Sequence, residues 1–331
     1  MKKLLLPLIL LLLLSGCGGK SLCYEAGFFA MDTVMEVRIY DKALGSSLSA
    51  EICHEIAALE NCLSVTKEDS AIAKLNSGSS VALSPDVKEL LDRTASIHER
   101  SGGLLDPTIY PIVKLWGFTT GENRVPSQEE IDKTLTLTGM EHLMRDGDTL
   151  RLTDGAQLDF GAVAKGYAAE KCAEILSDNN VSGILTLGGN IQTVGEKPDG
   201  TDWHIGITDP EQPEQSLAAL SFKGSRAVVT SGGYQRYFEE DGIRYCHIMD
   251  PRTGAPARSG LSSVTVISES GLLSDGLSTA LYVMGLEAAE SFWRSCDDFE
   301  AILIEENGTI HVTSGLLDCF SCERAYEVIE R

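Results

Sequence analysis

An aspartate and a threonine stand four residues apart in the segment Ser274-Asp275-Gly276-Leu277-Ser278-Thr279-Ala280-Leu281. Residues at this spacing lie on one face of a helix, so Asp275 and Thr279 would present a carboxylate and a hydroxyl together. Magnesium accepts such hard oxygen ligands and uses one or two carboxylates, with water and substrate phosphates completing its octahedron. Taken alone, the segment is explained more simply by a helix capped at Ser274, in which Asp275 complements the dipole.

A second segment, Leu158-Asp159-Phe160-Gly161-Ala162-Val163-Ala164-Lys165-Gly166-Tyr167, begins like a strand and passes through small residues into a helix. Small residues allow a ligand to approach the backbone closely, and Lys165 can meet a phosphate as a point charge. An ordinary turn with a surface lysine explains the segment equally well. The P-loop pattern G-x-x-x-x-G-K-[ST] is absent, so that class of phosphate site is excluded.

A histidine, His247, alternates with apolar neighbours before a turn that begins at Asp250-Pro251. On a strand its side chain points to one face, and with an ordinary pKa near neutrality it can act as a general base. A structural histidine beside a turn is the more usual alternative. Three further turns are weak signals when each is taken alone: Asp106-Pro107-Thr108, Gly188-Gly189-Asn190 and Ser231-Gly232-Gly233-Tyr234-Gln235-Arg236-Tyr237.

The hydrophobic pattern supplies the elements that must position these residues. Helices are predicted over the stripe Ile52, Ile56, Leu59 and Leu63, after Ser84-Pro85, after the capping box Ser127/Glu130, and over 166–176 and 274–284. Strands are predicted over 31–39, 184–187, 203–207, 226–230, 245–249 and 263–267, with hairpin turns at Asp146-Gly147 and Asn307-Gly308. Strands with interspersed helices, many hairpins and few βαβ units indicate an α+β fold, and no linker divides the chain.

The N-terminus has the pattern of an export signal. Lys2 and Lys3 precede an apolar run over 4–14, which is too short to span a bilayer because a spanning helix needs about 20 residues. The next residues, Leu14-Ser15-Gly16-Cys17, resemble a bacterial lipobox, in which cleavage precedes a lipid-bearing cysteine. We expect a signal peptide over 1–16, lipidation of Cys17, a tether over 17–28, a domain over 29–331, and a protein anchored on the extracytoplasmic face of the membrane. An ordinary signal peptide with a chance cysteine is the alternative.

Charge and cysteine content argue against several classes of site. The chain has 331 residues, a formal net charge of -22 and no basic cluster, which argues against nucleic-acid binding and against electrostatic docking on anionic lipid. An acidic protein that binds an anionic cofactor needs a bound cation or well-placed backbone N–H groups. Eight cysteines besides Cys17 show no regular framework, and Cys319-Phe320-Ser321-Cys322 lacks the partners of a zinc site, so free thiols are expected in preference to disulfides.

Together these segments resemble the ordered motifs of the ApbE family, the FAD:protein FMN transferases. The resemblance begins at Met31-Asp32-Thr33 and covers nearly the whole chain after the tether. The remaining motifs are Leu63-Ser64, Asp69-Ser70, Asn76, Asp106-Pro107-Thr108, Leu115-Trp116-Gly117-Phe118, 159–167, Gly188-Gly189-Asn190, 231–238, 247–254 and 275–281. Because so many separate motifs occur in family order, the simpler explanations of the single segments are set aside.

The resemblance implies a role for each matching position. Met31, Asp106, Pro107, Thr108, Asp159 and Lys165 would contact FAD, the Ala162 carbonyl with Asp275 and Thr279 would hold Mg²⁺, and His247 would be the base near the reacting phosphate. The implied reaction transfers FMN from FAD to a threonine of a membrane flavoprotein subunit of an ion-translocating redox complex, with release of AMP.

Two positions depart from the family pattern. Asp32 replaces a glycine, and Thr66 stands near the flavin where many transferases have a tyrosine. Loss of that ring would weaken stacking and let water compete with threonine, which favours the alternative of a FAD pyrophosphatase that forms FMN and AMP. A non-catalytic flavin-binding lipoprotein is the third hypothesis, and the intact Asp275, Thr279 and His247 argue against it.

Overall fold

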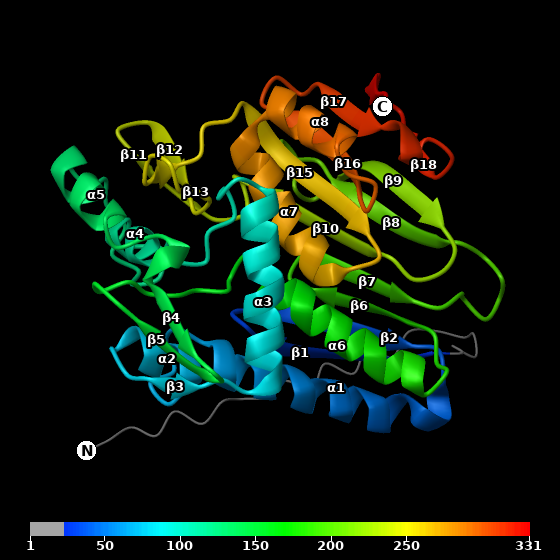
Figure 1. Ribbon diagram of the computed structural model, residues 1–331. Coiled ribbons are helices and arrows are strands. Elements are labelled where there is room, and N and C mark those ends of the chain that lie inside the picture. Colours follow the sequence, from blue (N-terminus) through cyan, green and yellow to red (C-terminus); the bar gives the residue numbers. More distant parts are fainter. Residues whose placement is uncertain (1–22) are drawn as a thin grey trace, which may run out of the picture.

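A nine-stranded sheet crosses the computed structural model, which describes residues 23–331 (Figure 1). Its order is β1-β2-β6-β7-β10-β15-β16-β17-β19, and every neighbouring pair is antiparallel except β17 and β19. The strands are β1 (Tyr24–Ala30), β2 (Thr33–Ile39), β6 (Gly183–Leu187), β7 (Asn190–Val194), β10 (Ala227–Gly232), β15 (Leu261–Ser268), β16 (Glu300–Glu305), β17 (Ile310–Thr313) and β19 (Glu327–Ile329). Because the sheet is built almost entirely without parallel pairs, the predicted α+β class is confirmed.

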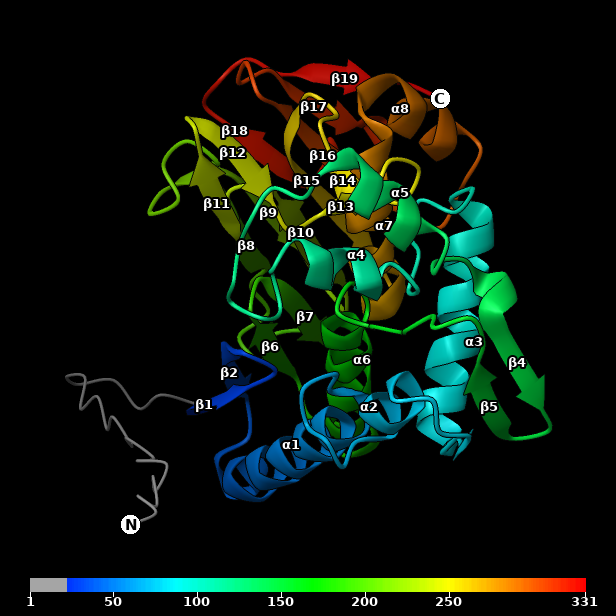
Figure 2. The ribbon, with the colours of Figure 1, turned by 90° about the vertical axis from the view of Figure 1, so that its left-hand side faces the viewer.

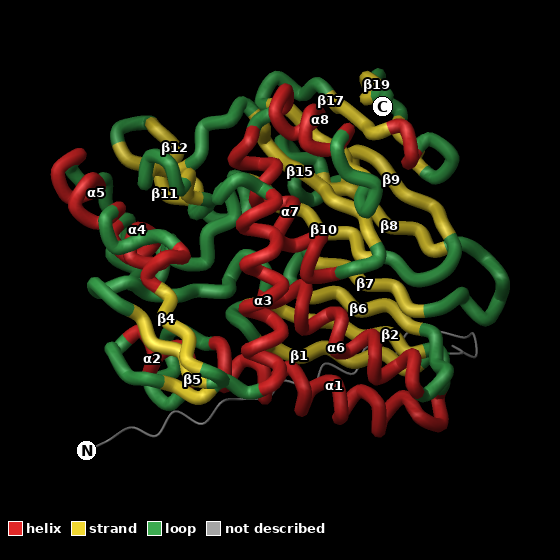
Figure 3. The backbone as a smooth tube through the Cα atoms, in the orientation of Figure 1, coloured by secondary structure: helices red, strands yellow, loops and turns green. Residues whose placement is uncertain are grey.

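Helices cover one face of this sheet and enclose the main hydrophobic core. They are α1 (Lys42–Leu63), α3 (Pro85–Arg100), α6 (Ala164–Asp178), α7 (Gly271–Met284) and α8 (Leu286–Arg294). In Figure 3 the helices α1, α6 and α7 lie in front of the yellow strands. Apolar helix residues such as Ile52 and Leu90 are buried with sheet residues such as Val37 and Val264, and this burial is the main favourable term in folding.

A three-stranded sheet packs against the large sheet and forms a second core. Its strands are β8 (Trp203–Thr208), β9 (Ser216–Phe222) and β18 (Phe320–Cys322), in the order β18-β9-β8. Trp203 and Leu220 of this sheet share one cluster of buried residues with Val228 and Ile302 of the large sheet. The large sheet is therefore covered on both faces over much of its area.

Shorter elements complete the fold, and several of them form the lobe that faces the viewer in Figure 2. They are α2 (Ala71–Asn76), α4 (Tyr110–Leu115), α5 (Gln128–Leu135), β3 (Val81–Ala82), β4 (Leu143–Asp146), β5 (Thr149–Leu152), β11 (Tyr237–Glu240), β12 (Ile243–Cys246), β13 (Met249–Asp250), β14 (Ala255–Pro256), η1 (Met140–His142) and η2 (Ser314–Leu316). Trp116, just after α4, donates its indole N–H to the Gly254 carbonyl at 2.8 Å and packs on Tyr245. This tryptophan fastens the lobe to the segment that carries His247.

Most predicted elements are confirmed. Ser84 caps α3, and the Ser127/Glu130 capping box begins α5. The turns at Asp146-Gly147 and Asn307-Gly308 join the antiparallel pairs β4–β5 and β16–β17.

Three predicted bounds were wrong. The strand predicted over 245–249 is interrupted, because β12 ends at Cys246 and β13 begins at Met249, and His247 lies in a bend. Helix α7 is capped by Ser270 rather than Ser274, since the Ser270 hydroxyl accepts the Leu273 N–H at 3.0 Å. The last part of the tether predicted over 17–28 belongs to β1, which pairs with β2 from residue 24 onward.

The predicted signal peptide over 1–16 and the lipidation site Cys17 lie outside the described residues. Within residues 23–331, no helix is both long enough and apolar enough to cross a membrane. No disulfide links the cysteines of this part of the chain.

The closest approach between α6 and α7 depends on two glycines. A Cβ added to Gly166 would overlap the Gly271 carbonyl, and one added to Gly271 would overlap the Gly166 carbonyl. Backbone atoms, unlike the end of a flexible side chain, cannot move aside cheaply. The two helices can therefore touch only because both positions lack a side chain.

We predict that Gly166→Ala lowers the free energy of unfolding by about 1–3 kcal/mol, the usual cost of overpacking. Gly27→Ala is the matched control, because its new Cβ would meet only the Met35 carbonyl at 3.7 Å. Urea unfolding of both variants measures the difference. An unchanged midpoint for Gly166→Ala would contradict the backbone contact between the helices.

Candidate active site

One cleft brings together almost all of the residues singled out in the sequence. It has a volume of about 550 Å³ and lies between the β1–β2 turn, the first turn of α6, the second and third turns of α7, and the segments around Asp106 and His247. The predicted residues that line it are Met31, Thr66, Asp106, Pro107, Asp159, Ala162, Lys165, His247, Asp275 and Thr279. A larger open groove of about 1090 Å³, beside β11 and β12, contains none of them.

Thr108 does not line the cleft, in contrast to the role expected for it. It is fully buried, and its backbone N–H and its hydroxyl both donate to Asp106 Oδ1, at 2.8 and 2.5 Å. Its hydroxyl also accepts the Gly139 N–H at 2.6 Å. Thr108 thus orients the Asp106 carboxylate from behind the cleft wall.

The two acidic segments of the cleft are joined through their backbones. The Asp159 N–H donates to the Pro107 carbonyl at 2.8 Å, which places Asp106 and Asp159 on neighbouring stretches of chain. Burial raises the pKa of the Asp159 carboxyl, and the Gly161 N–H, which donates to Oδ1 at 2.9 Å, opposes that rise. The carboxylate also holds the small-residue turn that leads into α6.

Asp275 lies in the second turn of α7 and is almost completely buried, with 4% of its surface exposed. Its Oδ2 accepts a hydrogen bond from the Gly166 backbone N–H at 2.8 Å. Burial raises the pKa of this carboxyl, while the Lys165 ammonium and the Gly166 N–H oppose the rise. No lysine or arginine of residues 23–331 forms an ion pair with it. A buried carboxylate with so little compensation is stabilised by a cation placed beside it.

The donors beside Asp275 fit a divalent cation with oxygen ligands. Thr279 lies one turn further along α7, with its hydroxyl 3.3 Å from that of Ser231, and Ala162 lines the same cleft. The buried Asn190 amide also opposes the burial-driven rise in the pKa of Asp275, yet its Nδ2 makes no hydrogen bond of normal geometry. The described residues contain no cluster of three or more His, Cys, Asp or Glu side chains suited to a metal. The expected set is of another kind, with one carboxylate, one hydroxyl and one carbonyl, and it leaves positions for substrate phosphates.

Two cations line the cleft without an ion-pair partner among the described residues. Lys165 Nζ lies 3.4 Å from the Gly161 carbonyl oxygen, and the Arg236 guanidinium donates to the Phe118 carbonyl. In a chain with a net charge of -22, such cations create a local site for an anion. Lys165 was predicted from the sequence to meet a phosphate, whereas Arg236 was given no role, because its only signal is its place in the glycine turn over 231–237.

The His247 imidazole is oriented by the backbone of Arg236. Its Nδ1 lies 3.1 Å from the Arg236 carbonyl oxygen, and because a carbonyl can only accept, Nδ1 carries the proton and Nε2 keeps its lone pair. Burial and, to a smaller extent, the positive charges of Lys165 and Arg236 lower the pKa of His247 to about 4. The hydrogen bond to the Arg236 backbone opposes this shift. The expected pKa near neutrality was therefore wrong, and the imidazole stays neutral, with its Nε2 lone pair open, down to a lower pH than an ordinary histidine.

The β1–β2 turn places Met31 at the rim of the cleft. Met31 and Asp32 both have positive φ, at 47° and 59°, as the central residues of a tight type I′ hairpin turn require. Asp adopts this conformation more readily than most residues, so the replacement of glycine by Asp32 leaves the turn intact. Thr66 lines the same cleft and is exposed, and its hydroxyl lies 3.1 Å from that of Ser64. No aromatic ring occupies this position.

Comparisons with known proteins identify the family of this chain. A model of the ApbE family matches residues 31–303. The chain belongs to the ApbE family. It is 32% identical to a Treponema pallidum protein named FAD:protein FMN transferase, over 95% of this chain and 94% of that protein. A Vibrio cholerae protein of the same name is also 32% identical, over 87% of this chain and 89% of its own length.

Solved structures of ApbE proteins share the fold. The ApbE protein of Thermotoga maritima superposes with a TM-score of 0.83 at 32% identity, covering 88% of this chain and 97% of that one. The apo flavinyl transferase ApbE of Pseudomonas stutzeri gives a TM-score of 0.77 at 33% identity, covering 86% and 92% of the two chains. The family resemblance, the α+β architecture and the assignment of this ApbE protein as a transferase are thus confirmed.

We predict that the His247 ring titrates with a midpoint near its lowered pKa of about 4. The ring is neutral above this pH and becomes protonated only as the pH falls through it, because burial and two nearby cations disfavour the charged form. NMR titration of the ring protons measures the midpoint, and His247→Gln identifies the resonance by its disappearance. A midpoint near 6.5, the ordinary value for histidine, would contradict the lowered pKa and the neutral imidazole.

Proposed function

We propose that this ApbE protein is a magnesium-dependent FAD:protein FMN transferase, which attaches FMN to a threonine hydroxyl of a target flavoprotein and releases AMP. The observation that carries the proposal is the cleft that unites the buried Asp275 carboxylate, the neutral His247 and the unpaired Lys165 and Arg236. The names of the relatives support the same activity.

The cleft residues suit the pyrophosphate of FAD, which carries two negative charges. Lys165 and Arg236 attract phosphate oxygens as cations, and Asp275, Thr279 and the Ala162 carbonyl would hold the divalent cation. When bound there, the cation would supply positive charge beside the pyrophosphate and so stabilise the charge that develops on the departing AMP. Asp106 and Asp159 line the same cleft, where their carboxylates would accept hydrogen bonds from hydroxyl and N–H groups of the dinucleotide.

The chemical step is a displacement at the phosphorus on the FMN side of the pyrophosphate. The threonine hydroxyl oxygen forms a new P–O bond, and the bond from that phosphorus to the bridging oxygen breaks, so AMP leaves with the electron pair. His247 Nε2 takes the hydroxyl proton, because Nδ1 is already protonated and bonded to the Arg236 carbonyl. Positioning of the acceptor and of the phosphates supplies most of the rate enhancement.

Thr66 favours a second candidate activity, the hydrolysis of FAD to FMN and AMP. This side chain is exposed at the cleft rim and offers no aromatic surface for the flavin ring. Water can replace the threonine hydroxyl in the same step, with the same base and the same leaving group. A weakly held flavin and an open rim both increase the access of water.

The proposed location is the extracytoplasmic face of the membrane, with Cys17 as the lipid anchor. The lipobox-like Leu14-Ser15-Gly16-Cys17 supports this, and β1 begins at Tyr24, only seven residues after Cys17. A short tether would keep the cleft near membrane-bound acceptors. The proposed partners are accordingly flavoprotein subunits of ion-translocating redox complexes.

A labelling assay tests the proposal. The purified protein is incubated with FAD, Mg²⁺ and an acceptor flavoprotein domain, and covalent flavin on the acceptor and free AMP are both measured. We expect one AMP for each flavin attached. AMP without labelled acceptor would favour the pyrophosphatase, and unchanged FAD would leave only a flavin-binding protein.

We predict that Asp275→Ala lowers Mg²⁺-dependent turnover by at least about 100-fold, because groups that merely support a metal ligand already cost 10–100-fold. His247→Ala should instead slow turnover by about 10²–10⁴-fold, the usual contribution of a general base, while FAD still binds. The control is Asp132→Ala, which removes an exposed carboxylate on α5. Full activity of Asp275→Ala would refute its assignment as the metal ligand.

A further inference from the structure

Helices α6 and α7 are joined by two hydrogen bonds of opposite direction. The Gly166 N–H on α6 donates to Asp275 Oδ2 on α7 at 2.8 Å. One turn further along α6, Glu170 Oε1 accepts the Leu272 N–H on α7 at 3.1 Å. Each helix therefore contributes one backbone donor and one carboxylate, and we call the four residues Gly166, Glu170, Leu272 and Asp275 the helix clamp.

A close backbone contact at two glycines, next to these two hydrogen bonds, prevents α6 and α7 from shifting relative to each other. Gly166 and Gly271 bring their backbones together so closely that neither position has room for a Cβ. Sliding or rotating one helix would break this contact and lengthen both bonds of the helix clamp. Asp275 lies three residues beyond Leu272, on the same side of α7. The position of the first turn of α7 therefore determines the direction in which the Asp275 side chain points.

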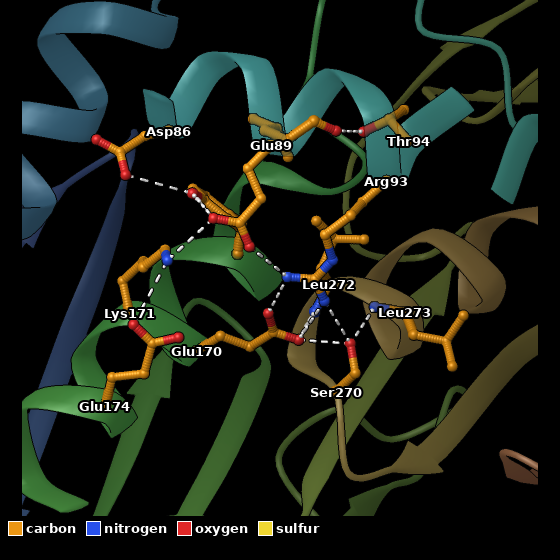
Figure 4. A network of polar contacts seen from close by, with 12 residues as sticks. Asp86, Glu89, Arg93, Thr94, Glu170, Lys171, Glu174, Ser270, Leu272 and Leu273 are labelled. Carbon is orange, nitrogen blue, oxygen red and sulfur yellow. Dashed lines mark hydrogen bonds and ion pairs between the residues drawn. The ribbon is translucent and has the colours of Figure 1, made fainter. Parts of the chain in front are cut away.

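Arg93 of α3 keeps Glu170 in place (Figure 4). Its guanidinium binds both carboxylate oxygens, at 2.7 and 3.0 Å, and donates to the Ser270 hydroxyl at 3.0 Å. Ser270 caps α7 and also donates its hydroxyl proton to Glu170. With 14% of its side chain exposed, Glu170 is a largely buried charge that needs such a bidentate partner.

We propose that Glu170, held by Arg93, is a positioning residue that aims the Asp275 carboxylate and the Thr279 hydroxyl into the cleft. The inference rests on the proposed function, in which these two groups hold a divalent cation. Glu170 does not line the cleft and touches no reacting group. Glu170 fixes the start of α7 against α6. It thereby sets where the Asp275 and Thr279 side chains, which come later in α7, point within the cleft.

The neighbouring Lys171 provides a matched comparison. Its ammonium binds Glu89 of α3 at 3.1 Å, so it also links α3 to α6, and its side chain is 18% exposed, close to the 14% of Glu170. It makes no ion pair or hydrogen bond with α7 among the described residues. Figure 4 shows Lys171 on the far side of Glu89 from Ser270. Loss of Lys171 should weaken the α3–α6 contact without releasing α7.

The test compares wild type, Glu170→Gln, Arg93→Lys and Lys171→Gln as purified proteins. Mg²⁺ is titrated into each protein with FAD and no acceptor, and flavin fluorescence reports the Mg²⁺ dependence of binding. In separate samples that contain the acceptor flavoprotein domain, AMP release is measured at varied Mg²⁺, and the melting temperature of each protein is also measured. Glu170→Gln should raise the Mg²⁺ concentration at half-saturation about tenfold, which is the lower end of the usual loss in metal affinity when a group that orients a metal ligand is removed. Turnover should be largely restored at saturating Mg²⁺.

Lys171→Gln should lower the melting temperature but leave the Mg²⁺ half-saturation unchanged. Arg93→Lys keeps a cation beside Glu170 but loses the bidentate geometry, so its Mg²⁺ half-saturation should lie between those of wild type and Glu170→Gln. If Glu170→Gln does not fold, Arg93→Lys replaces it as the test variant. Equal half-saturation in all variants, with only melting temperatures reduced, would show that Glu170 is merely structural. Wild type that binds and turns over FAD without Mg²⁺ would overturn the proposed metal site, and this inference with it.

Discussion

Burial of the Asp275 carboxylate is the constraint from which the arrangement of the site follows. Removing such a charge from water is unfavourable, and the Gly166 N–H together with the more distant Lys165 compensates it only in part. The low dielectric that makes the lone charge unfavourable also strengthens its attraction for a cation placed beside it. A carboxylate kept in this state is prepared for a metal ion and the phosphates that accompany it.

The close contact of α6 and α7 is a consequence of the same constraint. A backbone N–H can reach Asp275 only if the helices approach to backbone distance, which requires glycine at positions 166 and 271. The approach is then fixed by a second bond, from Leu272 to Glu170, and by Arg93 from a third helix. The large sheet and its two cores supply the rigid support against which these helices pack.

The charged groups of the cleft affect both the binding of an anion and the protonation of His247. Lys165 and Arg236 offer positive charge to an anionic substrate in an otherwise acidic protein, and they also disfavour a proton on His247. The Arg236 carbonyl fixes the tautomer that leaves Nε2 open. Attraction of phosphate and preparation of the base are thus two effects of one arrangement of charges.

The sequence by itself determined the local elements and most of the site residues. Helical and strand periodicity and the capping residues Ser84 and Ser127 depend on neighbours in the chain, so they are readable without the fold. The tertiary structure decided the burial, the cleft position and the pKa of the site residues, because these depend on residues distant in the sequence. It placed Thr108 behind the cleft wall, added Arg236, and lowered the pKa of His247, because burial is set by the packing of separate segments. The bond between Gly166 and Asp275 joins residues 109 positions apart, and no local pattern encodes such a contact.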